Sequence, residues 1–178
     1  EGIITPSTAF PCSNGFVFNK FRLGCHAHSS PIALAPAIAT SCNAYFCWGL
    51  HRMFNSDKYS GTKEAMNRWR DYMVSMGFGY KLGVDLPGEV RGMIPNADYY
   101  TRHYGNYWRA LTVISISIGQ GEVTLTPLQI ANLGATIANR GTYFTPHIVK
   151  AIEGDTIKEE YRTPHSTMVS PAVYEQIA

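Results

Sequence analysis

Residues 34–50 read LAPAIATSCNAYFCWGL, and this stretch decides how the rest of the chain is interpreted. Small apolar residues lead into a polar triplet, Ser41-Cys42-Asn43, and bulky apolar residues lead out of it. The pattern predicts one buried helix ending at Thr40, a polar kink, and a second buried helix. Buried polar groups are costly unless they are hydrogen-bonded, so a hydroxyl and a carboxamide between two packed helices indicate a chemical role. Such a pair can relay a proton and orient an amide.

Three further motifs accompany the triplet, which is the only Ser-x-Asn in the chain and a weak signal alone. They are CHAHSSP at 25–31, VDLPGE at 84–89 and SIGQGEVTLTPLQIANLGATIANRGTYFTPHIVK at 117–150. With these neighbours, the chain resembles the transpeptidase domain of elongation-type class B penicillin-binding proteins, the penicillin-binding protein 2 group. The resemblance implies an α+β fold, that of penicillin-binding transpeptidases and serine β-lactamases. We expect a mostly helical partial domain with a short hairpin and few sheet strands.

The resemblance assigns catalytic roles to Ser41 and Asn43. The family uses a Ser-x-x-Lys nucleophile, a Ser-x-Asn and a Lys-Thr-Gly strand. Ser41 matches the serine that passes a proton toward the leaving amine, and Asn43 matches the asparagine that holds the substrate's acyl-chain amide. The structural alternative is a helix junction in which both side chains only satisfy backbone groups.

The other two catalytic motifs of the family are not found in their expected places. The sequence contains no Lys-Thr-Gly, and its one Ser-x-x-Lys, Ser60 to Lys63, follows the Ser-x-Asn instead of preceding it. Ser60 also stands where a helix must be capped, which explains it without catalysis. We therefore expect an interior piece of a transpeptidase domain that is inactive by itself and forms no covalent penicillin adduct.

A cluster of cysteines and histidines flanks the triplet and predicts a structural zinc site formed by Cys12, Cys25, His28 and Cys42. Some elongation-type members carry zinc beside Ser-x-Asn on two aspartates, a histidine and a cysteine. By that resemblance, Cys12 and Cys25 stand in the aspartate positions, and thiolates are soft ligands that suit zinc.

Alternatives for this cluster stay open. A Cys12–Cys25 disulfide is compatible with an oxidising compartment, and free core thiols are also possible. His26 is the alternative ligand to His28. Cys47, on an apolar helix face, is interpreted as a small core residue.

For the intact protein, the resemblance implies a serine D,D-transpeptidase that cross-links peptidoglycan stem peptides through an acyl-enzyme and binds β-lactams. It implies an N-terminal anchor in the cytoplasmic membrane, outside this chain, a catalytic domain on the periplasmic side, and partners in the cell-elongation machinery. A net charge of +2 is too small to indicate nucleic acid as a partner. Two alternative functions are a penicillin-binding sensor domain that does not cross-link and a zinc-stapled interaction module.

The sequence predicts a single partial domain over residues 1–178 in three parts. Residues 1–31 form a loop excursion with a hairpin, 32–110 the helical part, and 111–178 a strand–helix–strand part that is truncated before Lys-Thr-Gly. The first expected elements are a helix at 62–76 with a buried methionine stripe, a turn-rich ribbon at 79–92, and an aromatic segment at 96–108 that either lines a substrate groove or forms an irregular loop. After them we expect a strand or a buried extended segment at 111–118, a capped helix from Thr126, a strand at 143–152 and a helix opened by Ser170.

Overall fold

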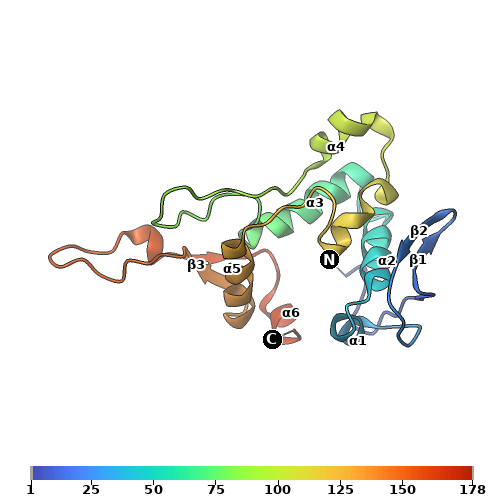
Figure 1. The fold of residues 1–178 in the computed structure, drawn as a ribbon, viewed down its shortest axis with the longest axis horizontal. Coiled ribbons are helices and arrows are strands. Elements are labelled where there is room, and N and C mark those ends of the chain that lie inside the picture. The colour runs from blue at the N-terminus through green and yellow to red at the C-terminus, as the bar shows by residue number, and fades with distance from the viewer. Residues whose placement is uncertain (1, 178) are drawn as a thin grey trace. The chain divides into compact units, whose positions relative to one another are not determined.

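The structure is a computed structural model that describes residues 2–177 and contains short helices and strands joined by long loops (Figure 1). No helix in this described part is long and apolar enough to cross a membrane. The α-helices are α1 Leu34–Ala39, α2 Asn43–Phe54, α3 Thr62–Ser75, α4 Ala97–Tyr104, α5 Pro127–Ala138 and α6 Pro171–Glu175. The 3-10 helices are η1 Gly105–Tyr107, η2 Ala110–Ile118 and η3 Glu159–Tyr161, and the strands are β1 Gly15–Phe18, β2 Phe21–Gly24, β3 Thr142–Phe144 and β4 Pro164–Ser166.

The chain divides into two compact units. The first contains the chain up to Met66 together with Ala97–Gly121. The second contains Asn67–Asn96 and the chain from Glu122 onward, so α3 contributes to both.

Helix α2 forms the centre of the first unit, where it packs against η2 and against the β1–β2 hairpin. The predicted hairpin is confirmed, with Gly15 opposite Gly24 and Phe18 opposite Phe21 in an antiparallel register. Phe16 is fully buried and meets the Trp48 ring edge-to-face at 4.6 Å between centroids. Aromatic pairs of this geometry add to the area they bury, so the hairpin is fixed to α2 by its apolar face.

The predicted kink between α1 and α2 is confirmed, but the first helix is not buried. Ser41 has a left-handed backbone with φ of 51°, which stops α1 and turns the chain. Cys42 then caps α2, since its Sγ accepts the N–H of Tyr45 at 3.3 Å. In α1 only Ala37 is buried, because one turn and a half of helix presents a single narrow face to the unit.

Two expectations for the region after α3 are wrong. Residues 111–118 form η2 instead of a strand, and its end is set by Gly119 in the left-handed conformation at φ 70°. A short apolar run cannot be assigned by periodicity alone, and here Ser117 Oγ also bonds the Ile114 carbonyl three residues back, at 2.7 Å. The expected aromatic loop at 96–108 contains α4 and η1, because buried Tyr100 packs on Trp108 at 5.3 Å and orders the segment.

Helix α3 is confirmed over nearly the predicted range, and Gly77 follows it at φ 92° as a left-handed stop. The methionine stripe is only partly buried. Met66 is in the core, whereas Trp69, Met73 and Met76 are half-buried.

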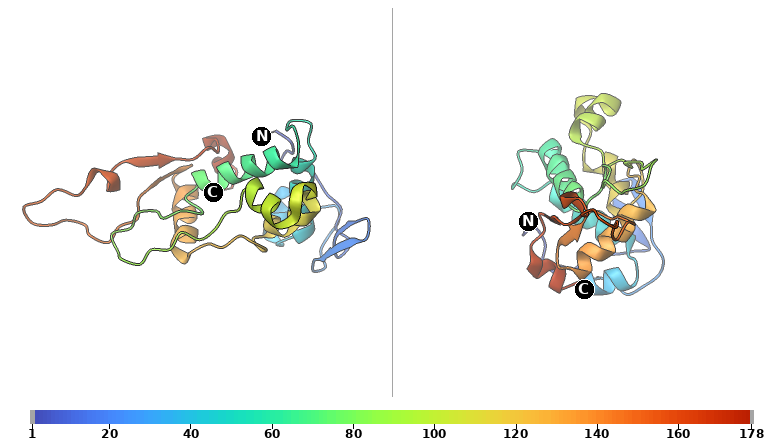
Figure 2. Two further views of the ribbon diagram at one scale, coloured as in Figure 1. Left: turned by 90° about the horizontal axis from the view of Figure 1, so that it is seen from above. Right: turned by 90° about the vertical axis from the view of Figure 1, so that its left-hand side faces the viewer.

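In the second unit, α5 has the predicted capping box. Gln129 N–H donates to Thr126 Oγ1 at 3.2 Å, and Thr126 N–H donates to Gln129 Oε1 at 3.1 Å. The strand expected at 143–152 is shorter, ending at Phe144, because Pro146 cannot donate to a ladder. It pairs with β4 in antiparallel register, and α6 begins after Ser170 as expected. Figure 2 shows the long excursion between β3 and β4.

Candidate catalytic motif and metal centre

The two ends of the β1–β2 hairpin bring Cys12 and Cys25 together. The hairpin closes where the Cys25 N–H donates to the Asn14 carbonyl at 3.0 Å. On the other side, the Cys12 N–H donates to Ser30 Oγ at 3.0 Å. Residues on either side of the hairpin are therefore held next to the segment that follows it.

The ligand atoms of Cys12, Cys25, His28 and Cys42 lie within 4.8 Å of one another, so the structure brings together all four residues predicted from the sequence. Cys12 and Cys42 are buried, while Cys25 and His28 are half-buried. The Cys25 Sγ and His28 Nε2 atoms are 3.6 Å apart. A sulfur and a nitrogen ligand on one tetrahedral zinc ion are also separated by about 3.6 Å.

His28 is better placed than His26 to bind a metal ion at the cluster. Its Nδ1 lies 2.8 Å from the Ser29 carbonyl, which only accepts, so Nδ1 carries a proton and Nε2 is the ring nitrogen that faces Cys25 Sγ. This arrangement is common in metal-binding histidines. The alternative, His26, is exposed and its Nδ1 is 4.0 Å from Cys25 Sγ.

The thiols of the cluster differ in acidity. For Cys25, burial acts to raise the pKa, but hydrogen bonds, foremost that with His28, outweigh burial and lower the pKa to about 7. Burial raises the pKa of Cys42 to about 11, although the Tyr45 N–H acts in the opposite direction. Because a metal binds thiolates, its binding would release protons, most of all at Cys42. Three thiols and an imidazole in this arrangement fit zinc.

The catalytic candidates Ser41 and Asn43 flank the ligand Cys42 in sequence. The Asn43 Nδ2 donates to the Gly24 carbonyl at 3.0 Å, which fastens the carboxamide to the hairpin one residue before Cys25. Ser41 is exposed, contrary to the expectation of a buried hydroxyl, and Asn43 is half-buried. A hydroxyl that exchanges a proton with a substrate must be reachable from solvent, so the left-handed turn at Ser41 is consistent with such a role.

Residues 1–178 match the family described as the penicillin binding protein transpeptidase domain. The chain belongs to this family. It is 38% identical over 136 residues to the peptidoglycan D,D-transpeptidase MrdA of Acinetobacter baumannii, covering 76% of this chain and 19% of that protein. It is 30% identical over 168 residues to MrdA of Haemophilus influenzae, covering 92% of this chain and 24% of that protein.

Solved structures of penicillin-binding proteins are also similar to this chain. The crystal structure of Pseudomonas aeruginosa PBP2 in complex with WCK 5153 has a TM-score of 0.77 at 24% identity, covering 99% of this chain and 37% of that chain. A peptidoglycan synthase complex has a TM-score of 0.74 at 28% identity, covering 98% of this chain and 28% of that chain. The expected α+β transpeptidase fold and the resemblance to penicillin-binding protein 2 are confirmed.

This transpeptidase chain spans about a fifth to a quarter of the length of the two curated relatives. Its one Ser-x-x-Lys does not have the geometry of the family's nucleophile. Ser60 Oγ and Ser60 N–H both donate to the Glu64 carboxylate at 2.6 Å, and Lys63 Nζ donates to Asn106 Oδ1 at 3.0 Å. Both groups of Ser60 are thus bonded to a side chain of the first turn of α3, although its hydroxyl donates there instead of accepting a helix N–H as a cap would.

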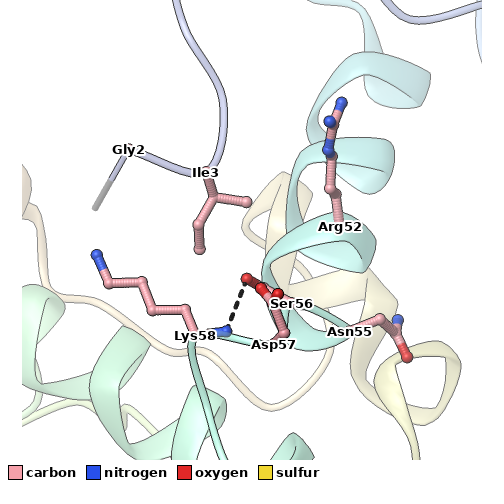
Figure 3. Close-up of a pocket in the computed structure, with 7 residues that line it drawn as sticks. All are labelled: Gly2, Ile3, Arg52, Asn55, Ser56, Asp57 and Lys58. Carbon is pink, nitrogen blue, oxygen red and sulfur yellow. Dashed lines mark hydrogen bonds between the residues drawn. The ribbon is translucent and has the colours of Figure 1, made fainter.

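A hollow of ≈ 540 Å³ lies at the other end of α2 from the Ser-x-Asn kink (Figure 3). The turn after α2 forms its wall, and the Lys58 N–H donates to Ser56 Oγ at 3.2 Å. Its lining mixes charges of both signs, including Arg52 and Asp57, so it selects no single ligand class. None of the predicted site residues lines this hollow.

Three contributions to the site were not predicted from the sequence. The Gly24 carbonyl accepts a hydrogen bond from Asn43, and the Ser29 carbonyl accepts one from His28. Ser30 Oγ accepts a hydrogen bond from the Cys12 N–H. Two of these are backbone atoms, for which residue identity carries no signal. The serine pair in CHAHSSP was part of a recognised motif, and small polar residues beside candidate ligands were the available clue.

Proposed function

We propose that this chain is the part of a peptidoglycan D,D-transpeptidase that carries the Ser-x-Asn motif. In the intact protein, a serine nucleophile outside this chain forms an acyl-enzyme with a stem peptide or a β-lactam. As the acyl-enzyme forms, Ser41 passes a proton toward the leaving amine, and Asn43 holds the amide of the acyl chain. Proton transfer by a positioned side chain contributes about 10²–10⁴-fold to a rate.

The observation that carries this proposal is the fixed orientation of the Asn43 carboxamide beside an exposed Ser41. Because Asn43 Nδ2 donates one hydrogen to the Gly24 carbonyl at 3.0 Å, the carboxamide has a set rotation. Its Oδ1 can accept the N–H of a substrate amide, and the second Nδ2 hydrogen can be donated to another group. A substrate bound at this kink would therefore meet one acceptor and one hydroxyl from the same turn.

The same kink is proposed to be held by zinc on Cys12, Cys25, His28 and Cys42. When bound, zinc would supply a structural cross-link between the ligands and would take no part in bond making or breaking. The chain's own contribution is the spacing of the four ligand atoms, all within 4.8 Å, and the Nδ1–H of His28 that holds the ring. Cys42 is the ligand through which the cross-link would reach Ser41 and Asn43.

The proposed setting is the outer face of the cytoplasmic membrane, with an anchor outside this chain and the catalytic domain on the periplasmic side. Partners in the cell-elongation machinery are proposed as well. Support comes from two similar structures, a complex between PBP2 and MreC from Helicobacter pylori and a peptidoglycan synthase complex that coordinates polymerisation and crosslinking.

The test is acylation of the full-length protein by a fluorescent penicillin, comparing Ser41→Ala and Asn43→Ala with wild type. We expect each variant to slow acylation by about 10²-fold or more with a nearly unchanged melting temperature. Ser60→Ala is the matched control, because it removes the hydroxyl of the chain's only Ser-x-x-Lys and should leave acylation unchanged. Acylation of both motif variants within about three-fold of wild type, with the fold intact, would reduce the motif to a helix junction.

A further inference from the structure

The proposed zinc ligands come from two structural elements that are not covalently joined except through the intervening chain. Cys12 and Cys25 flank the β1–β2 hairpin, whereas Cys42 caps α2 at the kink. Three of the four ligands are thiols, and all four cysteines of the chain are free in the structure. Thiols at this distance can form either metal–thiolate bonds or a disulfide. Whether the cysteines bind zinc or form a disulfide therefore determines whether the hairpin is linked to the start of α2.

The two hairpin thiols are the better placed pair for a disulfide. The backbone brings their segments together, since Cys25 N–H donates to the Asn14 carbonyl at 3.0 Å close to Cys12. Their Sγ atoms lie within 4.8 Å of each other, so a side-chain adjustment of about 3 Å would reach the S–S bond length of ~2 Å. Cys25 is half-exposed and on a loop, so it has room for this adjustment.

Cys42 is held more firmly. It is fully buried at the first turn of α2, and its Sγ accepts the Tyr45 N–H at 3.3 Å. Moving this sulfur toward another thiol would break the cap and disturb the start of the helix. Disulfide formation with Cys42 therefore costs an interaction that a bond between Cys12 and Cys25 preserves.

We propose that Cys12 and Cys25 are a modification site, forming a reversible disulfide under peroxide that expels the zinc and leaves Cys42 as a thiol. This inference rests on the zinc site proposed above. In the step, the two thiolates lose two electrons and form one S–S bond, while hydrogen peroxide takes up these electrons and two protons and leaves as two waters. Zinc leaves as Zn²⁺, and the Cys42 sulfur takes up a proton. A dithiol reductant returns two electrons and restores the ligands.

The structural consequence is a change in what the hairpin is fastened to. With zinc, the hairpin ends and the kink share one centre, whereas the disulfide joins the two hairpin ends only to each other. The Asn43 carboxamide then keeps the Gly24 hydrogen bond and the aromatic packing of Phe16 on Trp48 as its ties to the hairpin. Oxidation would thus loosen the motif turn without unfolding the unit.

The experiment titrates the reduced, zinc-loaded chain with hydrogen peroxide and follows zinc release with a chromogenic chelator. The chain is then denatured, its free thiols are alkylated, and it is digested with trypsin under non-reducing conditions. Trypsin cleaves after Lys20 and Arg22, so Cys12 and Cys25 fall in separate peptides that only a disulfide can join. The Cys25 peptide, residues 23–52, also contains Cys42 and Cys47, and fragment ions from the stretches between them tell the three apart.

We expect one zinc released per Cys12–Cys25 linkage, alkylated Cys42 and Cys47, and recovery of zinc binding after treatment with dithiothreitol and added zinc. Cys47 is an internal control, because it is fully buried and its Sγ lies 3.4 Å from Ser117 Oγ, away from the proposed ligands. The Cys42→Ala variant should still form the linkage, and Cys25→Ala should not.

Two results would overturn this inference and spare the zinc site: zinc that stays bound under peroxide, or a linkage or irreversible oxidation that involves Cys42 in place of the hairpin pair. A reduced chain that binds no zinc would overturn the zinc site and the exchange together.

Discussion

Two stretches of this chain lie outside the regular core and are fastened in different ways. The hairpin segment, residues 12–30, packs on α2 through Phe16 and carries three of the four proposed zinc ligands, which lie beside Cys42. The ribbon, residues 79–92, is held at several separate points. With zinc bound as proposed, the hairpin segment depends strongly on one metal centre, whereas the ribbon depends on many separate hydrogen bonds.

The fastenings of the ribbon are hydrogen bonds from single side chains to backbone groups. Glu89 accepts the N–H of Leu82 and of Gly83 at 2.6 and 3.0 Å. Asp85 accepts the N–H groups of 148 and 149 at 2.8–3.1 Å. Water competes for exposed hydrogen bonds of this kind and weakens each of them, so no single one decides the ribbon's structure.

A centre built from four ligands fails when one ligand or the metal is removed, because the remaining three cannot hold the geometry. A distributed set of hydrogen bonds weakens step by step. The two stretches should therefore respond very differently to single substitutions of comparable size.

The largest effect is expected for removal of zinc from the hairpin segment, by chelation or by Cys42→Ser. Structural zinc supplies about 10–16 kcal/mol in zinc-finger peptides, and even a quarter of that exceeds most single-residue effects in a domain. The melting temperature measured by calorimetry should fall by several degrees or more. Cys47→Ser is the control for introducing a serine at a buried cysteine. Chelator should lower its melting temperature by as much as it lowers that of the wild-type chain.

Equal melting temperatures of the wild-type chain with and without chelator would show that no metal ion stabilises the hairpin segment. The hairpin segment would then be held, like the ribbon, by ordinary contacts such as the Asn43–Gly24 hydrogen bond.

An intermediate effect is expected for Gln129→Ala in α5, which is the ribbon's most buried fastening. Gln129 is 1% exposed, and its Nε2 donates to the carbonyls of Tyr80 and Arg91 at 2.8 and 3.0 Å, at the two ends of the ribbon. The substitution leaves both carbonyls and the Thr126 N–H without this partner. We expect a loss of about 2–4 kcal/mol in the free energy of unfolding, measured by denaturant titration.

Gln120→Ala is the matched control for that measurement, because Gln120 is exposed and should change stability by less than about 0.5 kcal/mol. Equal losses for the two glutamines would mean that the ribbon does not depend on Gln129.

The smallest effect is expected for Asp85→Asn, and it should depend on pH. The N–H groups of Val149 and Ile148 lower the pKa of Asp85 below its ordinary value of 3.8. A carboxyl with a lowered folded-state pKa adds stability above its unfolded pKa and loses that contribution as the pH falls through the folded value. The variant should thus be less stable at neutral pH and approach wild type as the pH falls below 3.8.

Melting temperatures from pH 2 to 7 measure this effect, with Asp71→Asn in α3 as a control in an exposed carboxyl. A deficit of the Asp85 variant that stays constant down to pH 2 would show that charge is not the cause.

The sequence predicted those features that are encoded locally. Thr126, Pro127 and Gln129 start α5 within four residues, and the Cys/His spacing predicted which side chains would meet. It did not predict η2, because an apolar run of Leu, Ile and Val fits a strand and a 3-10 helix equally well.

The ribbon's fastenings were also missed, because Asp85 meets Ile148 across 63 positions, and its partner is a backbone group that any residue supplies. In the site, Ser41 and Asn43 could be named from the motif and its neighbours. The exposure of Ser41 and the hydrogen bond from Asn43 to the Gly24 carbonyl depend on tertiary contacts, which the motif does not encode.

The central claim is that one zinc ion joins the hairpin to the kink that carries Ser41 and Asn43. The most direct measurement combines elemental analysis of the purified, reduced chain with zinc-edge X-ray absorption, for wild type and for Cys42→Ser. We predict close to one zinc per chain with three sulfur ligands at about 2.3 Å and one nitrogen at about 2.0 Å, falling to two sulfurs or to no bound zinc in the variant. Negligible zinc in the reduced wild-type chain, or three sulfurs retained in Cys42→Ser, would contradict the claim.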